Sequence, residues 1–157
     1  MKRLLACLFC CCLLLSLVAC GEREILDRIV DADGQNPIVF GMTPEEVTAI
    51  LGEPNADGYL DDGHILVSYD LEDDVVKEIT LLPGASYRLP NGLCADDDKE
   101  AVLDRMGDPQ GMDEETIAYL YDSTGEIPEH QMAVDYSVQF AMEGDAIRSI
   151  TLLKFRH

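Results

Sequence analysis

The sequence predicts an α+β protein made of two tandem units, each with a helix followed by an antiparallel sheet. One observation is a helix pattern at residues 43 to 54 that recurs 55 positions later, at residues 98 to 109. The other is a hairpin pattern at residues 65 to 82 that recurs 71 positions later, at residues 136 to 153, with seven identities in 18 aligned residues. Neither unit can cover its apolar strand face alone, so the two units are expected to share a core, either stacked or joined edge to edge.

Residues 1 to 19 are predicted to be a lipoprotein signal peptide. Two cations, Lys2 and Arg3, precede an apolar run that is shorter than the roughly 20 residues a membrane-spanning helix needs. The end of this run, Leu17 to Gly21, resembles the lipobox of bacterial lipoproteins, in which a cysteine after a small residue is lipidated and becomes the mature N-terminus. Cys20 is therefore the expected lipidation site. The alternative is an ordinary signal peptide with an incidental cysteine.

The expected location is extracytoplasmic and lipid-anchored, on the outer leaflet of the cytoplasmic membrane, or on the outer membrane if the cell has one. The chain has 31 Asp+Glu against 11 Lys+Arg and a net charge of -20. This charge repels anionic headgroups, so the lipid and not the protein surface should hold the chain at the membrane. It also repels phosphate backbones, which excludes nucleic-acid binding, and it favours a basic partner.

Residues 20 to 37 are expected to hold the lipidated cysteine, a tether and a short helix. Ile25, Leu26, Ile29 and Val30 have the spacing of one helix face. The following Asp31 to Gly34 resembles the start of a calcium loop, but the glutamate such a loop needs at its twelfth position is replaced by Met42. A helix end at this point is the favoured interpretation.

Each unit is expected to begin with a short, capped helix. In the first, Thr43 is the N-cap, Pro44 occupies the first turn, Glu46 completes a capping box, and Gly52 ends the helix. The predicted helices therefore span residues 43 to 51 and 98 to 106. The second helix starts at Asp98 without the proline and the glutamate, so its start should be weaker.

The strand patterns and the turn residues between them set the domain boundaries. Alternating residues predict hairpins at 65 to 82 and 136 to 153, and the second unit has 16 extra residues that include an alternating run at 116 to 121. The first unit is assigned to residues 38 to 83 and the second to residues 93 to 157. Proline and glycine residues mark 84 to 92 as the joint.

The alternation also assigns the hairpin side chains to two faces. The residues predicted to face the core are Ile65, Val67, Tyr69, Ile79, Leu81, Val138, Phe140, Ile150 and Leu152. The residues predicted on the other face are Leu66, Ser68, Glu78, Thr80, Leu82, Gln139, Thr151 and Leu153. In a fold with one layer of helices on a sheet, this second face is open and is the candidate binding surface. The alternative is that Leu66, Leu82 and Leu153 are buried between the two units.

No catalytic motif is found in the sequence after Cys20. Phosphate loops, CxxC, HExxH and GxSxG patterns do not occur, and the three histidines lie far apart. Cys94 is interpreted as a small buried residue, with a nucleophile paired to a distant histidine as the alternative. The acidic clusters lack the alternating carbonyl or amide ligands of a calcium site, so they are interpreted as turns and helix starts. No catalytic residue, metal site or cofactor is predicted.

Two related families resemble these motifs. A lipobox followed by GMTPEEVTAILGEP and a hairpin is similar to the opening of the small outer-membrane assembly lipoproteins of the BamE (SmpA) type. The tandem arrangement resembles the β-lactamase-inhibitor-protein-like (BLIP-like) fold, in which helices pack on an antiparallel sheet. The resemblance covers residues 38 to 82 well and residues 93 to 153 weakly.

The sequence thus predicts a non-enzymatic binding protein of the cell envelope, with an adaptor-like or inhibitor-like role. Its expected partner is another envelope protein or an exported protein. If the resemblance extends to function, the BamE side implies a factor for outer-membrane protein assembly, and the inhibitor side implies a protein that blocks an active site. A hydrolase or redox enzyme built around Cys94 is the alternative from another functional class.

Overall fold

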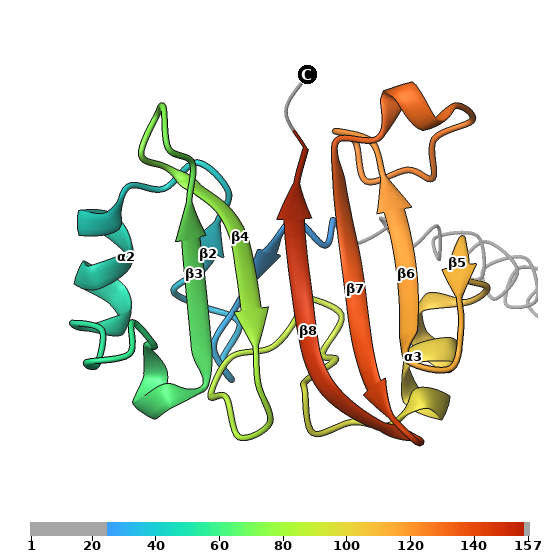
Figure 1. Ribbon diagram of the computed structural model, residues 1–157, viewed down its shortest axis with the longest axis horizontal. Coiled ribbons are helices and arrows are strands. Elements are labelled where there is room, and N and C mark those ends of the chain that lie inside the picture. The colour runs from blue at the N-terminus through green and yellow to red at the C-terminus, as the bar shows by residue number, and fades with distance from the viewer. Residues whose placement is uncertain (1–24, 156–157) are drawn as a thin grey trace, which may run out of the picture.

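The computed structural model describes residues 25 to 155 and has a mixed α+β architecture (Figure 1). The strands and helices, in chain order, are β1 (Arg28–Ile29), β2 (Ile38–Val39), α2 (Pro44–Leu51), η2 (Asp61–Gly63), β3 (Ile65–Tyr69), β4 (Val76–Leu81), α3 (Lys99–Met106), β5 (Gly111–Met112), β6 (Thr116–Tyr121), η3 (Gln131–Ala133), β7 (Tyr136–Glu143) and β8 (Ala146–Lys154). The predicted signal peptide and Cys20 lie outside the described residues. None of the described helices is long and apolar enough to cross a membrane.

Residues 25 to 30 form no helix, so the expectation of a short helix there was wrong. Arg28 and Ile29 form β1, which pairs antiparallel with β2. Leu26 and Ile29 are buried in the core, so this segment is also not a free tether. The apolar spacing that suggested a helix face is explained by tertiary contacts, because a short apolar run has no reliable period of its own.

Both predicted helices are confirmed, together with their caps. Thr43 Oγ1 accepts from the Glu46 N–H and Glu46 Oε2 accepts from the Thr43 N–H, which completes the capping box of α2. In α3 the Asp98 carboxylate accepts from the Ala101 N–H, and the alanine at this position has no side-chain acceptor to return the bond. Each helix buries one valine completely, Val47 in α2 and Val102 in α3.

The two predicted hairpins are also confirmed, and they lie in one six-stranded antiparallel sheet with the order β3-β4-β8-β7-β6-β5. Their inner strands, β4 and β8, pair directly at the centre of the sheet. Thr80 is opposite Thr151, and their hydroxyl oxygens lie 3.1 Å apart. The 16 extra residues include β6, which covers the outer side of β7.

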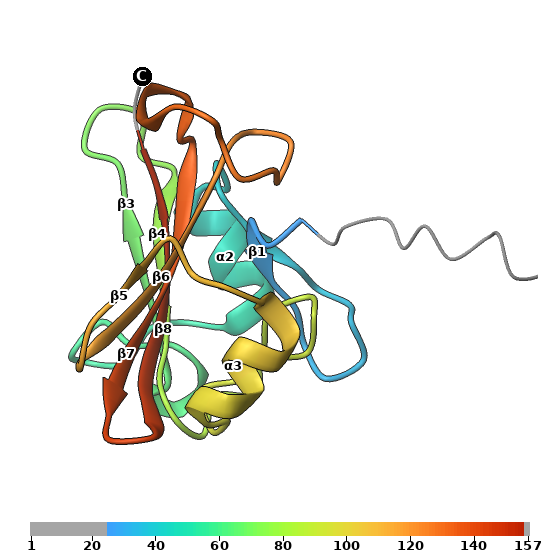
Figure 2. The same ribbon diagram turned by 90° about the vertical axis from the view of Figure 1, so that its right-hand side faces the viewer.

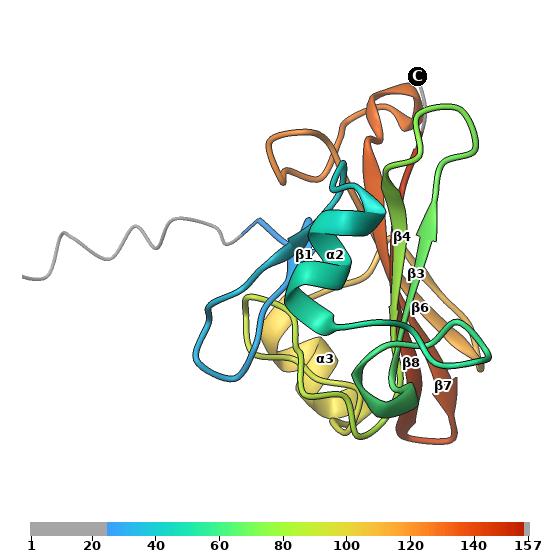
Figure 3. The same ribbon diagram turned by 90° about the vertical axis from the view of Figure 1, so that its left-hand side faces the viewer.

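One face of the sheet holds the core. Figures 2 and 3 show α2, α3 and β1 together on one side of the sheet, while the other side carries no helix. Of the residues predicted to face the core, all are buried except Tyr69, which is half-buried. Tyr119 and Phe140 meet edge to face within this core, and Tyr121 stacks on Tyr136.

The segment at 84 to 92, expected to be a joint between units, packs into the same core. Val30 and Arg88 exchange two backbone hydrogen bonds of 2.9 Å, which continues the pairing of β1. Tyr87 and Leu89 are buried. The joint therefore fastens β1 to the rest of the molecule instead of acting as a loose linker.

Candidate functional site

The helix-free side of the sheet, called the open face here, carries the residues predicted as the candidate binding surface. All eight are of intermediate exposure: Leu66, Ser68, Glu78, Thr80, Leu82, Gln139, Thr151 and Leu153. Leu66, Leu82 and Leu153 are therefore not buried against a second layer.

Strand register arranges the open face in rows. The central row is Leu66, Thr80, Thr151, Gln139 and Ala118, taken across β3, β4, β8, β7 and β6. The next row is Ser68, Glu78, Leu153, Ser137 and Leu120. A third, shorter row is Ser149, Ala141 and Thr116. Register thus extends the predicted set onto β6, which the sequence analysis had not included in the face.

These rows are almost free of charge in a strongly acidic protein. Glu78 is their only charged side chain, although the chain has 31 acidic residues. Several polar groups satisfy one another within the face, since Thr80 bonds to Thr151 and Gln139 Nε2 donates to Ser137 Oγ at 3.1 Å. The resulting surface is weakly polar, and two pairs of its polar side chains bond to each other, with Ser137 itself fully buried. Surfaces that form the centre of protein interfaces are depleted of charge in the same way.

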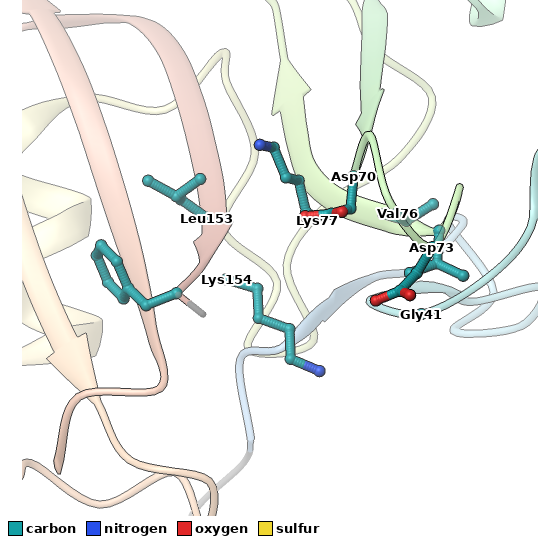
Figure 4. A pocket seen from close by; sticks show the side chains of 9 residues that line it. Gly41, Asp70, Asp73, Val76, Lys77, Leu153 and Lys154 are labelled. Carbon is teal, nitrogen blue, oxygen red and sulfur yellow. The ribbon is translucent and has the colours of Figure 1, made fainter. Parts of the chain in front are cut away.

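A pocket of about 290 Å³ lies where β4 and β8 separate at one end of the sheet (Figure 4). The pairing of these strands ends at Glu78 and Leu153, and beyond that point Val76 N–H donates to the Met42 carbonyl at 2.8 Å. The residues that line the pocket are Gly41, Asp70, Asp73, Val75, Val76, Lys77, Leu153, Lys154 and Phe155.

Lys77 and Lys154 enter this pocket from β4 and β8, respectively (Figure 4). Neither ammonium group has an ion pair within the part of the chain that the structure describes. The sequence analysis identified Leu153 of this pocket but none of its other residues. The other residues come from separate chain segments. The only sequence signal for this pocket was that two of the few lysines lie in the hairpin strands.

Cys94 does not have the environment of a nucleophile. Its side chain is half-buried, and its backbone N–H donates to Asp97 Oδ2 at 2.9 Å. Burial, together with the negative charges of Asp97 and Asp96, raises the pKa of the thiol. A raised pKa keeps the sulfur protonated at neutral pH, whereas a reactive cysteine needs the thiolate.

The acidic clusters make hydrogen bonds both within turns and between distant segments, so the expectation of turns and helix starts holds for only some of them. Asp61 accepts from the Ser86 N–H at 2.6 Å, Asp96 accepts from the Gly84 N–H, and Asp113 accepts from the Thr116 N–H at 2.8 Å. Within residues 25 to 155, no group of three or more His, Cys, Asp or Glu side chains is placed to hold a metal ion. Asp31 likewise closes the turn between β1 and β2, where it accepts from the Gln35 N–H at 2.7 Å.

The open face with its adjoining pocket is therefore the candidate site on geometric grounds. No family model matches the chain, and neither a curated protein nor a solved structure matches it.

Proposed function

We propose that this protein is a lipid-anchored, extracytoplasmic binding module without catalytic activity, which recognises another protein through the open face. The observation that supports this function best is the near absence of charge in the three rows of the open face. The chain has a net charge of -20, but these rows carry only Glu78. Such a surface loses little desolvation energy when a partner covers it.

The proposed architecture is that of two tandem units joined edge to edge, with the BLIP-like or BamE-like arrangement that the sequence resembles. Thr80 and Thr151 are 71 positions apart and face each other at the centre of the sheet. In the first unit, Val76 N–H donates to the Met42 carbonyl at 2.8 Å. The matching bond in the second unit runs from Ile147 N–H to the Asp97 carbonyl at 3.4 Å. These matched contacts support a duplication in which one shared sheet gives both units the same open face.

Binding is favoured over catalysis because the sequence after Cys20 carries no catalytic motif. The raised pKa of Cys94 supports the same conclusion. A role in outer-membrane protein assembly rests on the sequence resemblance alone, and the identity of the partner would distinguish it from an inhibitor-like role.

The open face is tested by placing a charge at its centre. The full chain is crosslinked in its own membrane, and the captured proteins are identified by mass spectrometry. Gln139→Lys lengthens the side chain by one atom, keeps a donor toward Ser137 and adds a charge, so we expect capture of the specific partner to be lost. Gln35→Lys is the matched control, because this exposed residue lies in the turn between β1 and β2. A partner retained by both variants would contradict the assignment of the face, and no specific partner for the unmodified chain would contradict the function.

The lipid anchor is tested separately by labelling with a fatty acid. Cys20→Ala removes the sulfur to which the lipid is expected to attach, so the precursor should stay unprocessed and unlabelled. Cys94→Ala is the matched control and should label normally. Labelling of the Cys20→Ala variant would refute the predicted location.

A further inference from the structure

The outer edge of β3 is only partly paired. At its start, Leu60 N–H donates to the Ile65 carbonyl at 2.8 Å, and Ile65 N–H donates back to the Leu60 carbonyl at 3.1 Å. Backbone groups alternate in direction along a strand, so the N–H and C=O of Val67 point to the same outer side. Among the described residues, no segment pairs with this side of β3 beyond Leu60, because Gly58 turns the chain away with φ of +85°.

The matching strand β7 has this edge covered. With the offset of 71, Tyr136 corresponds to Ile65 and Val138 corresponds to Val67. In β7, Tyr136 pairs with Tyr121 and Val138 pairs with Tyr119, both from β6. Leu60 therefore takes the place of Tyr121 in the first unit, and the place of Tyr119 is vacant.

The helix beside each sheet edge shows a second difference between the two units. The Tyr119 hydroxyl donates to the carbonyl of Gly107, the C-cap residue of α3, at 2.8 Å. With the helix offset of 55, Gly107 corresponds to Gly52, the C-cap residue of α2. Figure 1 shows α2 on the outer side of β3 with no strand in front of it. Within residues 25 to 155, the end of α2 thus receives no hydroxyl donor that matches the one at the end of α3.

A hollow of about 320 Å³ lies between the end of α2 and Leu60. It is lined by Leu51, Glu53, Asn55, Tyr59, Leu60, Asp61 and Asp62. Three of these side chains are acidic, and α2 has no basic residue in its last turn. A side chain that donates hydrogen bonds or carries a positive charge suits this position, because the C-terminal end of a helix is partly negative.

We propose that an extended segment of a basic partner protein adds to the sheet as an antiparallel strand beside β3, in the place that β6 takes beside β7. Its residue opposite Val67 carries tyrosine, arginine or lysine and reaches the end of α2. Acidic residues flank both ends of β3, at Asp61 and Asp62 and at residues 70 to 74, so cations at both ends of the added segment are favoured. A second copy of this chain is disfavoured as the occupant, because two chains of charge -20 repel each other.

This inference goes beyond the proposed function and does not rest on it, because it concerns the edge of the sheet and the backbone of β3. Strand addition of this kind obtains its affinity from main-chain hydrogen bonds and its specificity from alternate side chains. A substitution that adds a charge to the open face and one that prevents strand pairing at the edge of β3 should therefore affect binding separately.

The test uses a synthetic peptide that carries the first four residues of β6, TIAY, between two pairs of lysine, because Leu60 already occupies the position that corresponds to Tyr121. Amide hydrogen exchange of the full chain is followed by NMR with and without the peptide. We expect exchange at the Val67 amide to slow by about tenfold or more, while Leu66, whose backbone faces β4, stays unchanged. A control peptide with proline in place of its tyrosine lacks the N–H that pairs with the Val67 carbonyl and should give no slowing. Unchanged exchange at Val67, or equal slowing with both peptides, would overturn the proposal.

Variants of the protein give an independent readout. Val67→Pro removes the outward N–H, and a proline is tolerated where an edge strand faces solvent, so peptide binding should be lost while Val67→Ala retains it. If Val67→Pro fails to fold, Glu53→Gln should weaken binding of the peptide and Glu100→Gln, an exposed acid on α3, should not. Equal binding by Glu53→Gln and Glu100→Gln would overturn the charge argument.

A second copy of this chain is the competing occupant. If the chain forms a concentration-dependent dimer without peptide, and Val67→Pro abolishes that dimer, a second copy is the occupant and the proposed partner is overturned. Gln139→Lys should leave peptide binding unchanged.

Discussion

At the residue scale, oxygen-bearing side chains begin helices and close turns. The backbone N–H of Gln35, followed by the side chain of Asn36, lowers the pKa of the Asp31 carboxyl. The side chain of Thr124, followed by the backbone N–H of Glu126, lowers the pKa of Asp122. Each carboxylate thus satisfies donors within a few residues of itself. These acidic side chains therefore stabilise local structure.

The two helix starts allow a matched test of capping. Thr43→Ala removes the side-chain oxygen that accepts from the Glu46 N–H in α2. The reciprocal bond, from the N–H of residue 43 to the Glu46 carboxylate, should then weaken. We expect a loss of about 1 kcal/mol in the free energy of unfolding, measured by urea denaturation. Asp98→Ala in α3 removes a single cap of 2.9 Å and should cost a similar amount. A change near zero for both variants would show that the caps add nothing to the stability of the packed helices.

At the element scale, the contact between β4 and β8 unites the molecule. Four registered pairs join these strands, and Thr80 and Thr151 lie in the middle of them. The two hydroxyl groups bond to each other on a half-buried surface. Because a lone hydroxyl is costly at such a position, the two residues should be energetically coupled.

A double-mutant cycle measures this coupling. Thr80→Val and Thr151→Val each leave one hydroxyl without its partner, so each should lower the free energy of unfolding by about 0.5 to 1 kcal/mol. The double variant should cost no more than either single variant, since valine matches threonine in shape and suits a strand. Additive costs, measured by urea denaturation, would contradict a direct interaction between the hydroxyls.

At the scale of the whole molecule, the core contains several buried tyrosines, and one of them, Tyr119 of β6, bonds to the end of α3. Burial raises the pKa of Tyr119 to about 12, and it also raises the pKa of Tyr136 and Tyr87. The unfolded chain releases these phenolic protons near pH 10, but the folded chain retains them. Stability is therefore fully present below about pH 10 and is lost as the pH rises toward the folded pKa values.

Alkaline unfolding tests this linkage. From about pH 9 to about pH 12, the contribution of Tyr119 to the free energy of unfolding should fall by about 2 kcal/mol. Tyr119→Phe should cost about 1 kcal/mol at neutral pH, because the bond to the Gly107 carbonyl is lost. Its stability should then fall less steeply with pH than that of the unmodified chain, as followed by urea denaturation at each pH. Parallel pH profiles would contradict the role assigned to the phenol.

Local features of the chain were sufficient to predict much of the fold. Caps, helix ends and alternation predicted both helices, both hairpins and the faces of the residues named for them, since each depends on neighbours within a few positions. The register shift in each hairpin was not predicted, and it buries Val76 and Ile147 against the simple alternation. The segment at 25 to 30 was predicted wrongly, because its strand exists only through pairing with residues 38 and 39 and with Arg88. Of the candidate site, the open-face residues were predicted, while the pocket between β4 and β8 was predicted only at Leu153.

Capping and strand alternation are local, so the order of residues alone dictates where the helices begin and end and which side chains of each hairpin share a face up to its register shift. Packing of distant segments, by contrast, joins the hairpins through β4 and β8, places β6 beside β7, and leaves the outer edge of β3 without a partner beyond Leu60 among the described residues. Edge pairing is formed by backbone groups, which are identical in every residue apart from proline. The choice of neighbouring strand therefore depends on which arrangement buries the apolar face and brings distant edges together.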